Sequence, residues 1–245
     1  MTVLNYSIAE DIFKRHPGYV RGVVTVCGVR NGPSPEPLQQ LMREAEEALR
    51  GTVQPDAVAA HPRIAAWREA YRSFGANPGE FRSSVEAMAR RVLRGQSLPA
   101  INTLVDIGNL VSLRHLLPAG SHAMDTLRGN IELRTASGRE EFIPFGSDRM
   151  EHPLPGEIIF AEGDAVLVRR WTWRQANHTL TLQETMAVEF NVDGLPPASP
   201  ADVDLACGEI AELVKRFCGG RIGRGLLSEA HPVMALPAEI FPPAL

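Results

Sequence analysis

Short segments rich in β-branched and aromatic residues follow one another between residues 130 and 192, and they constrain the fold more than any other feature. Turn signals separate them at Ser137-Gly138, at 146–148 (Gly-Ser-Asp) and at Gly163-Asp164. Short strands joined by short turns are typical of an antiparallel sheet, because parallel strands need long crossovers. We therefore predict strands in NIELR (130–134), EEFIPF (140–145), EIIFA (157–161), AVLVRRWTW (165–173) and TLTLQETMAVEFNV (179–192).

The segments on either side of this strand-rich region have helical spacing. A β-branched segment at 19–29 predicts one buried strand before them. Helices are then expected from Pro35 to Gly51, from Pro62 onward, over 82–95 with Ser83 and Glu86 as a capping box, and from Ser199 to Phe217. This order predicts an α+β (mixed α/β) fold with a mostly antiparallel sheet system covered by helices. We expect an N-terminal strand-helix annex at 1–60, packed on a main domain at 61–245.

Composition excludes several classes of protein. A net charge of −4 and 44% hydrophobic residues are ordinary for a soluble globular enzyme, and a constitutive DNA- or RNA-binding protein is usually more basic. A transient tRNA substrate needs only a local positive patch. Three widely spaced cysteines, Cys27, Cys207 and Cys218, predict neither a disulfide framework nor a zinc site. No apolar run is long enough for a bilayer, so we expect a cytoplasmic protein with no membrane partner.

Two arginine-containing segments are candidates for a functional role. The segment CGGRIGRG (218–225) has glycines and arginines that suit a phosphate, but no strand precedes it, so a loop after a helix is favoured. In RRWTWRQ (169–175), Arg and Trp alternate, and such side chains can stack on nucleic-acid bases. The favoured alternative is structural, with the tryptophans covering the edge of the sheet and the arginines at the surface.

Polar residues interrupt two apolar segments and are candidates for chemistry. The segment VDIGNLVSLRHLLPAGSHAMD (105–125) places Asn109 and His122 among leucines and valines. Further on, Met186, Val188, Phe190 and Val192 share one strand parity, so Glu189 and Thr185 should face away from the apolar layer. A face with Thr, Glu and Asn is either solvated or part of a polar pocket.

Three motifs in this order resemble one family. VDIGN, then Pro118, then HAMD resembles the B3/B4 editing module of the phenylalanyl-tRNA synthetase beta subunit. GNIELRTASGREEF (129–142) resembles the strand and turn that follow in that module, and YRSFGANPGEFRSSVEA (71–87) is similar to the signature of free-standing proteins built on it. The resemblance spans roughly residues 70 to 220 and implies a single B3/B4-like editing-module fold.

The resemblance implies a hydrolase that removes a wrongly attached amino acid from tRNA, without a nucleophilic serine or cysteine. It places His122 at the scissile ester and Asn109 in the pocket as catalytic residues, and Glu189 as the residue that reads the substrate's polar group. Thr185, on the same strand face, and Arg170 and Trp171, as stacking groups, complete the expected substrate-binding set. Asp106 and Asp125 are expected to hold the backbone around the site. Two extra residues before His122, and a bulky RRWTWRQ in place of a glycine-rich stretch, leave the substrate's identity open.

The leading hypothesis is a free-standing tRNA-editing-like protein that hydrolyses a misacylated aminoacyl-tRNA with a positioned water. Transient tRNA is the expected partner, and no DNA, metal or cofactor is expected; the oligomeric state is open. Nothing resembles an aminoacylation domain. The alternatives are a non-catalytic module that binds tRNA or an amino-acid-like ligand, and a scaffold that keeps only the fold.

Overall fold

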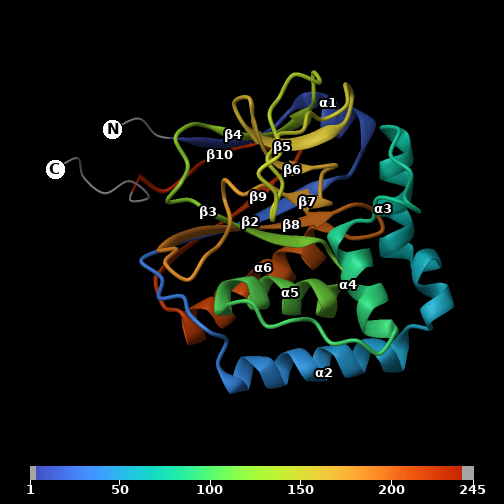
Figure 1. Ribbon diagram of the computed structural model, residues 1–245, viewed down its shortest axis with the longest axis vertical. Coiled ribbons are helices and arrows are strands. Elements are labelled where there is room, and N and C mark those ends of the chain that lie inside the picture. The colour runs from blue at the N-terminus through green and yellow to red at the C-terminus, as the bar shows by residue number, and fades with distance from the viewer. Residues whose placement is uncertain (1–3, 239–245) are drawn as a thin grey trace.

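Two β-sheets and two layers of helices build the fold in a computed structural model that describes residues 4–238 (Figure 1). One sheet has the order β10-β1-β4-β5-β6-β7 and the other has the order β3-β8-β2-β9. Every neighbouring pair is antiparallel except β1 and β4. The α+β class and the mostly antiparallel sheet system are therefore confirmed.

The elements follow one another as a strand-helix start, a helical stretch, a strand-rich stretch and a final helix with two strands. The helices are α1 (Glu10–Arg15), α2 (Glu36–Thr52), the 3-10 helix η1 (Pro55–Ala60), α3 (Pro62–Ser73), α4 (Ser84–Leu93), α5 (Thr103–His115) and α6 (Pro200–Phe217). The strands are β1 (Asn5–Ile8), β2 (Val20–Cys27), β3 (Ala119–Ala123), β4 (Ile131–Thr135), β5 (Ile158–Glu162), β6 (Ala165–Arg169), β7 (Arg174–Gln175), β8 (Ala187–Gly194), β9 (Arg221–Leu227) and β10 (Val233–Ala235).

The four-stranded sheet lies in the middle of the molecule and has an apolar core on each side. Figure 1 shows the six-stranded sheet above it, α5 and α6 below it, and α2 beneath those helices. Tyr6, Tyr19 and Phe160 belong to the core between the sheets, and Phe190 and Ile210 belong to the core between sheet and helices. Strand β8 is buried along its whole length because both of its faces are covered.

Strand β8 shows the alternation that its sequence predicts. Val188, Phe190 and Val192 lie in the core that contacts the helices. Glu189 lies on the opposite face, toward the six-stranded sheet, because successive side chains of a strand alternate. The predicted orientation of Glu189 is confirmed, and the face is buried rather than solvated. Met186, which shares the apolar parity, precedes the strand and is exposed.

The predicted helices are present, with one error in how they begin. Helix α6 starts in a capping box in which Ser199 and Asp202 bond each other's backbone N–H. Ser83 is the N-cap of α4, but its side chain makes no capping hydrogen bond. Glu86 instead accepts from Arg68 on α3 and from Arg90 one turn later. The predicted capping box at α4 is wrong because a buried ion pair takes the glutamate.

Four predictions about strands are wrong. Of the predicted strand 179–192, residues 179–186 lie outside any strand, since β8 begins only at Ala187, so Thr185 is not on a strand face. The segment 140–145 makes only isolated bridges, such as that between Phe142 and Glu151. The segment 221–227 is strand β9 and not a loop, and it covers the outer edge of β2. Strand β6 ends at Arg169, because Arg170 and Trp171 both have positive φ, 47° and 64°. A strand continuing to 173 is incompatible with that left-handed backbone.

The N-terminal segment and the rest of the chain share the same sheets. Strand β2 lies between β8 and β9, and β1 lies between β10 and β4. The boundary at residue 60 stays a prediction, and residues 239–245, at the end of the predicted main domain, lie outside the described part.

Within residues 4–238, no helix combines the length and the apolar character that crossing a bilayer requires.

Candidate functional site

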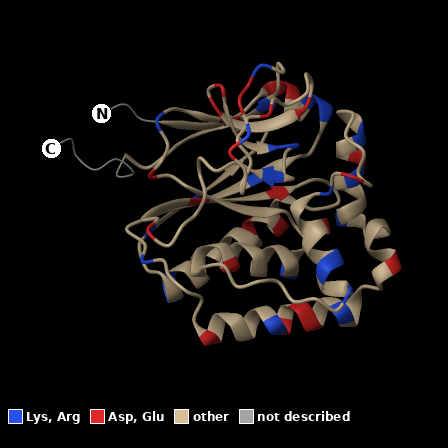
Figure 2. Ribbon diagram, viewed as in Figure 1, with Lys and Arg blue, Asp and Glu red and all other residues tan. Residues whose placement is uncertain are grey.

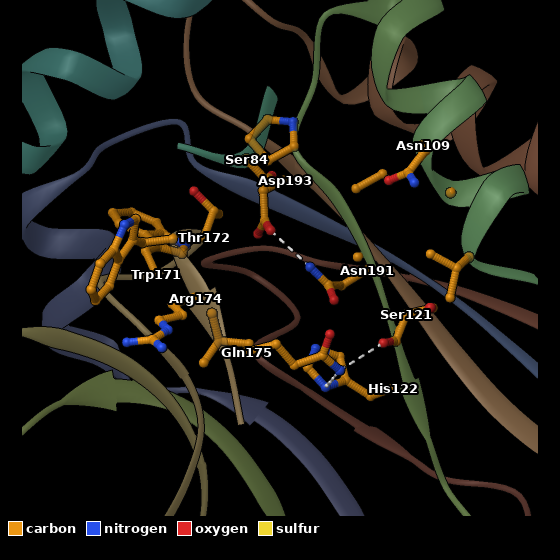
Figure 3. A pocket seen from close by; sticks show the side chains of 17 residues that line it. Ser84, Asn109, Ser121, His122, Trp171, Thr172, Arg174, Gln175, Asn191 and Asp193 are labelled. Carbon is orange, nitrogen blue, oxygen red and sulfur yellow. Dashed lines mark hydrogen bonds between the residues drawn. The ribbon is translucent and has the colours of Figure 1, made fainter. Parts of the chain in front are cut away.

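A cavity of about 220 Å³ opens where the two sheets and helix α5 meet. Figure 3 shows side chains from α5, β3, β8 and the segment after β6 around the same space. Its polar groups come from residues far apart in sequence, so only the fold brings them together. The lining comprises Ser84, Val105, Gly108, Asn109, Pro118, Ala119, Gly120, Ser121, His122, Val168, Trp171, Thr172, Trp173, Arg174, Gln175, Asn191 and Asp193.

His122 lies on β3, and two side chains contact its ring nitrogen Nδ1. Nδ1 is 2.8 Å from the Thr179 hydroxyl and 3.3 Å from the Gln175 amide nitrogen. That amide also donates to the carbonyls of Ser121 and Thr179, both at 3.1 Å. Burial lowers the pKa of His122 to about 3, and the positive charge of Arg21 acts in the same direction. The imidazole is therefore neutral and fixed in orientation at physiological pH.

Asn109 also lines this cavity, but from a helix. It lies in the second turn of α5, which begins at the N-cap Asn102, whose side chain accepts from the backbone of Val105. Helix α5 is not among the helices expected from the sequence, although its cap and the apolar spacing of 104–113 continue the helix through Asn109. His122 and Asn109, predicted from far-apart motifs, are thus brought to one cavity.

A buried charge network supports the inner side of the cavity. Arg21 forms a bidentate ion pair with Asp193, with N–O distances of 2.7 and 3.1 Å. The same guanidinium donates to the hydroxyls of Tyr19 and Tyr6. Asn191 donates to Asp193 at 2.9 Å, and its Oδ1 is buried without a hydrogen-bond partner among residues 4–238. Asn191 thus lines the cavity with an acceptor that the described part of the protein leaves unused.

Glu189 lies opposite His122 in the register of β3 and β8, but it does not line the cavity. It is fully buried, and neither carboxyl oxygen has a hydrogen-bond partner within the described residues. Burial raises its pKa to about 8, although the Arg21 charge acts against this. The group is mostly protonated at neutral pH. The structure therefore places it behind the site, in contact with the charge network.

Arg170 and Trp171 lie in a tight turn rather than on a surface strand. Trp171 is buried and makes edge contacts with Tyr19 and Trp67, and it also lines the cavity. Arg170 is buried over the rings of Phe81 and Trp173 and does not line it. The favoured expectation of tryptophans on a sheet edge and arginines at the surface is wrong, because the positive φ values turn both side chains inward.

The other predicted polar residues lie elsewhere. Thr185 accepts from the backbone of Leu182 and lines a different cavity, together with Asp125. Asp125 accepts from the backbone of Met186, and Asp106 accepts from Ile101. Both aspartates hold backbone, as expected, and neither lines the cavity of His122. Thr185 is not brought to that cavity either.

Five residues of the site were not named as candidates from the sequence, although Asn191 belongs to the polar strand face described there. They escaped because charged and amide residues in a strand are ordinarily read as solvated. For two of them a signal exists, because they continue the parity of Glu189 along β8. The Gln175 amide lies in the two-residue strand β7 and the Thr179 hydroxyl in an irregular segment, and neither carries a comparable signal. The missed residues are Arg21, Gln175, Thr179, Asn191 and Asp193.

The cavity favours chemistry without a protein nucleophile. Its lining, which lies wholly within residues 4–238, includes no cysteine and no lysine. Burial raises the pKa of Cys207 to about 12 and that of Cys218 to about 11, so neither thiol is activated. The Thr172 hydroxyl is 3.1 Å from that of Tyr71, and the Ser121 hydroxyl is 3.0 Å from that of Thr181. In the described part of the chain no His, Cys, Asp and Glu cluster has the size that a metal site needs.

Comparisons with known proteins agree with the motifs. The model of the B3/4 domain family matches residues 66–219. Among solved structures, the chain is similar to an N-terminal fragment of the phenylalanyl-tRNA synthetase beta subunit from Pyrococcus horikoshii, with 14% identity and a TM-score of 0.47. That likeness covers 89% of this chain and 49% of the fragment, so the chain spans about half of the fragment's length. The comparison with curated proteins found no match.

Proposed function

The chain belongs to the B3/4 domain family, and from that premise we propose that it hydrolyses the ester of a misacylated aminoacyl-tRNA with a water held in the His122 cavity. One observation carries the proposal. A neutral imidazole, fixed by Thr179 and Gln175, shares a polar cavity with Asn109 and with the unused acceptor of Asn191. These groups hold polar atoms in place without offering an activated nucleophile.

The substrate's own chemistry matches this set. An aminoacyl ester carries a positively charged ammonium group beside the carbonyl that is attacked. Asn191 lines the cavity, and its unused Oδ1 acceptor suits this group. A cavity of about 220 Å³ is small for a ligand pocket, since such pockets typically have about 300–1,000 Å³. It suits an amino acid and its ester, while the RNA lies outside.

The step itself is hydrolysis. The water oxygen bonds to the carbonyl carbon, the bond to the ribose oxygen breaks, and the ribose oxygen takes a proton released by the water. With a pKa of about 3, His122 is too weak a base to remove that proton at neutral pH. It acts as a hydrogen-bonding group that orients the water, and the Asn109 amide is a donor suited to the oxyanion.

A panel of mischarged tRNAs tests the proposal. Wild-type protein at micromolar concentration should release the amino acid from at least one member, and His122→Ala should lower that rate by about 100-fold or more. Asn177→Ala is a matched control. This exposed amide lies between Gln175 and Thr179 in sequence, but it is not part of the cavity lining. If every tRNA of the panel stays acylated with the wild-type protein, the proposal is wrong.

Binding without turnover is the second candidate. The burial of Glu189 favours it, because the residue expected to read the substrate does not reach the cavity. Calorimetry with free amino acids and uncharged tRNA separates the two candidates. A measurable affinity together with intact mischarged tRNA supports a binding module, whereas release of the amino acid supports the hydrolase.

A further inference from the structure

A second cavity, of about 450 Å³, lies beside α4 and adjoins the candidate site. Asn109 lines both cavities, so the two share a wall. Four arginines face this second cavity, and its lining, all of it within the described residues, includes no aspartate or glutamate. We call it the arginine groove; its lining is Arg82, Ala87, Met88, Arg90, Arg91, Arg94, Gln96, Leu98, Pro99 and Asn109.

The arginine groove has little local neutralisation. Among residues 4–238, Arg90 is the only one of the four arginines that bonds a carboxylate, that of buried Glu86, at 2.8 Å. Arg91 and Arg82 donate to backbone carbonyls, and Arg82 Nε is buried with no partner in the described part of the chain. Arg94 is exposed. Figure 2 shows blue segments along α4, in a protein whose net charge is −4. The guanidinium groups of the groove repel one another, and a bound anion would offset this repulsion.

We propose that the arginine groove binds the phosphodiester backbone of the RNA whose aminoacyl end enters the His122 cavity. This inference rests on the function proposed above. Guanidinium groups bind phosphate oxygens through paired N–H donors, which makes arginine well suited to such a groove. The lining has no aromatic side chain for base stacking, so the recognition is of the backbone and independent of base sequence.

Because the groove and the cavity share a wall, they can bind two parts of one substrate. The smaller cavity has room for an amino acid but not for a nucleotide, so a bound aminoacyl-RNA must leave it through an open side. Asn109 is at the junction, where the ester links the amino acid to the ribose. The RNA backbone then continues over α4.

A purely structural role is the competing explanation. Arg91 lies in the last turn of α4 and Arg94 is its C-cap, where positive charges complement the helix dipole. Helix α6 supplies a matched control, because Lys215 and Arg216 lie in its last turn and are exposed. Removing two charges from either helix changes net charge and dipole in the same way. Only the change on α4 alters the arginine groove.

The experiment measures the affinity of the full chain for uncharged tRNA by fluorescence anisotropy at several salt concentrations. Arg91→Ala with Arg94→Ala should weaken binding by about tenfold or more and flatten the dependence of log K on log salt by about 0.7 to 0.9 per lost phosphate contact. Arg91→Lys with Arg94→Lys should lie between this variant and wild type. Lys215→Ala with Arg216→Ala should stay within about twofold of wild type.

Two outcomes overturn the inference. One is a wild-type protein that does not bind tRNA, and the other is equal weakening by the α4 and α6 double variants. Thermal unfolding of each variant shows that the fold is intact. Uncharged tRNA has no ester, so this measurement does not depend on hydrolysis. Failure of the proposed function would instead leave mischarged tRNA intact in the wild-type assay while the groove still binds RNA.

Discussion

The two faces of strand β8 have opposite chemistry within the same eight residues. On one face, Val188, Phe190 and Val192 contact the helices and form a dry core. On the other, Glu189, Asn191 and Asp193 lie toward the six-stranded sheet, where Arg21 pairs with the last of them. Both faces are buried, so exposure does not distinguish them.

This difference separates a face whose burial stabilises the fold from a face whose burial is costly. The apolar face gains free energy from burial alone. The polar face holds charges and unsatisfied acceptors that burial disfavours, and such groups cluster at functional sites. We therefore propose that the polar face of β8, with His122 on the neighbouring strand, serves ligand chemistry.

The largest expected effect on stability comes from breaking the ion pair on the polar face. Asp193→Ala leaves the Arg21 charge buried without its carboxylate, which should lower the free energy of unfolding by about 3 to 5 kcal/mol. Asp204→Ala removes a carboxylate from the exposed pair with Arg224 and should cost less than about 1 kcal/mol. Urea denaturation measures both, and equal losses would contradict the description of the network.

The next effect is a pH dependence that originates at Glu189. The pKa of this carboxyl is about 8 in the folded protein and about 4.5 in the unfolded chain, so the unfolded state releases its proton first. Glu189 therefore contributes stability below pH 4.5 that is lost as the pH rises to 8. Glu189→Gln should remove this loss and be more stable than wild type at pH 8. Parallel stability curves for the two proteins would exclude the raised pKa.

A smaller effect is expected from placing a hydroxyl on the apolar face. Val188→Thr buries a hydroxyl among hydrocarbon side chains and should lower the free energy of unfolding by about 1 to 3 kcal/mol. Thr25 of β2 is the register partner of Glu189 on β8 and so lies on the polar side of the sheet. Thr25→Val is therefore the opposite exchange on that side. It should change stability by less than about 1 kcal/mol. If the two exchanges cost the same, the two faces do not differ as described.

Much of the fold follows from local patterns in the sequence. The apolar spacing of the helices, the capping residues Ser199 and Asp202, and the parity of β8 each depend on neighbours in sequence, and the structure confirms them. The strand β9 was missed because its segment RIGRGLL has glycines and arginines where strands usually have β-branched residues. Its pairing with β2 is a tertiary effect that no local signal predicts.

The site was predicted only in part, for the same reason. Asn109 and His122 were found because motifs mark them, and they do meet in one cavity. The turn at Arg170 and Trp171 depends on positive φ values, which non-glycine residues adopt only when surrounding packing favours them. The burial of Arg21 with Asp193 depends on both sheets, so no local pattern in the sequence indicates this pair.

The most direct test of a water-positioning His122 is the single-turnover rate of amino acid release from a mischarged tRNA between pH 5 and pH 8. Once the uncatalysed rate is subtracted, the wild-type rate should show no inflection near pH 6.5, because the pKa of His122 is about 3. His122→Ala should be slower by about 100-fold at every pH. An inflection near pH 6.5 that disappears in His122→Ala, or equal rates in the two proteins, would contradict this account.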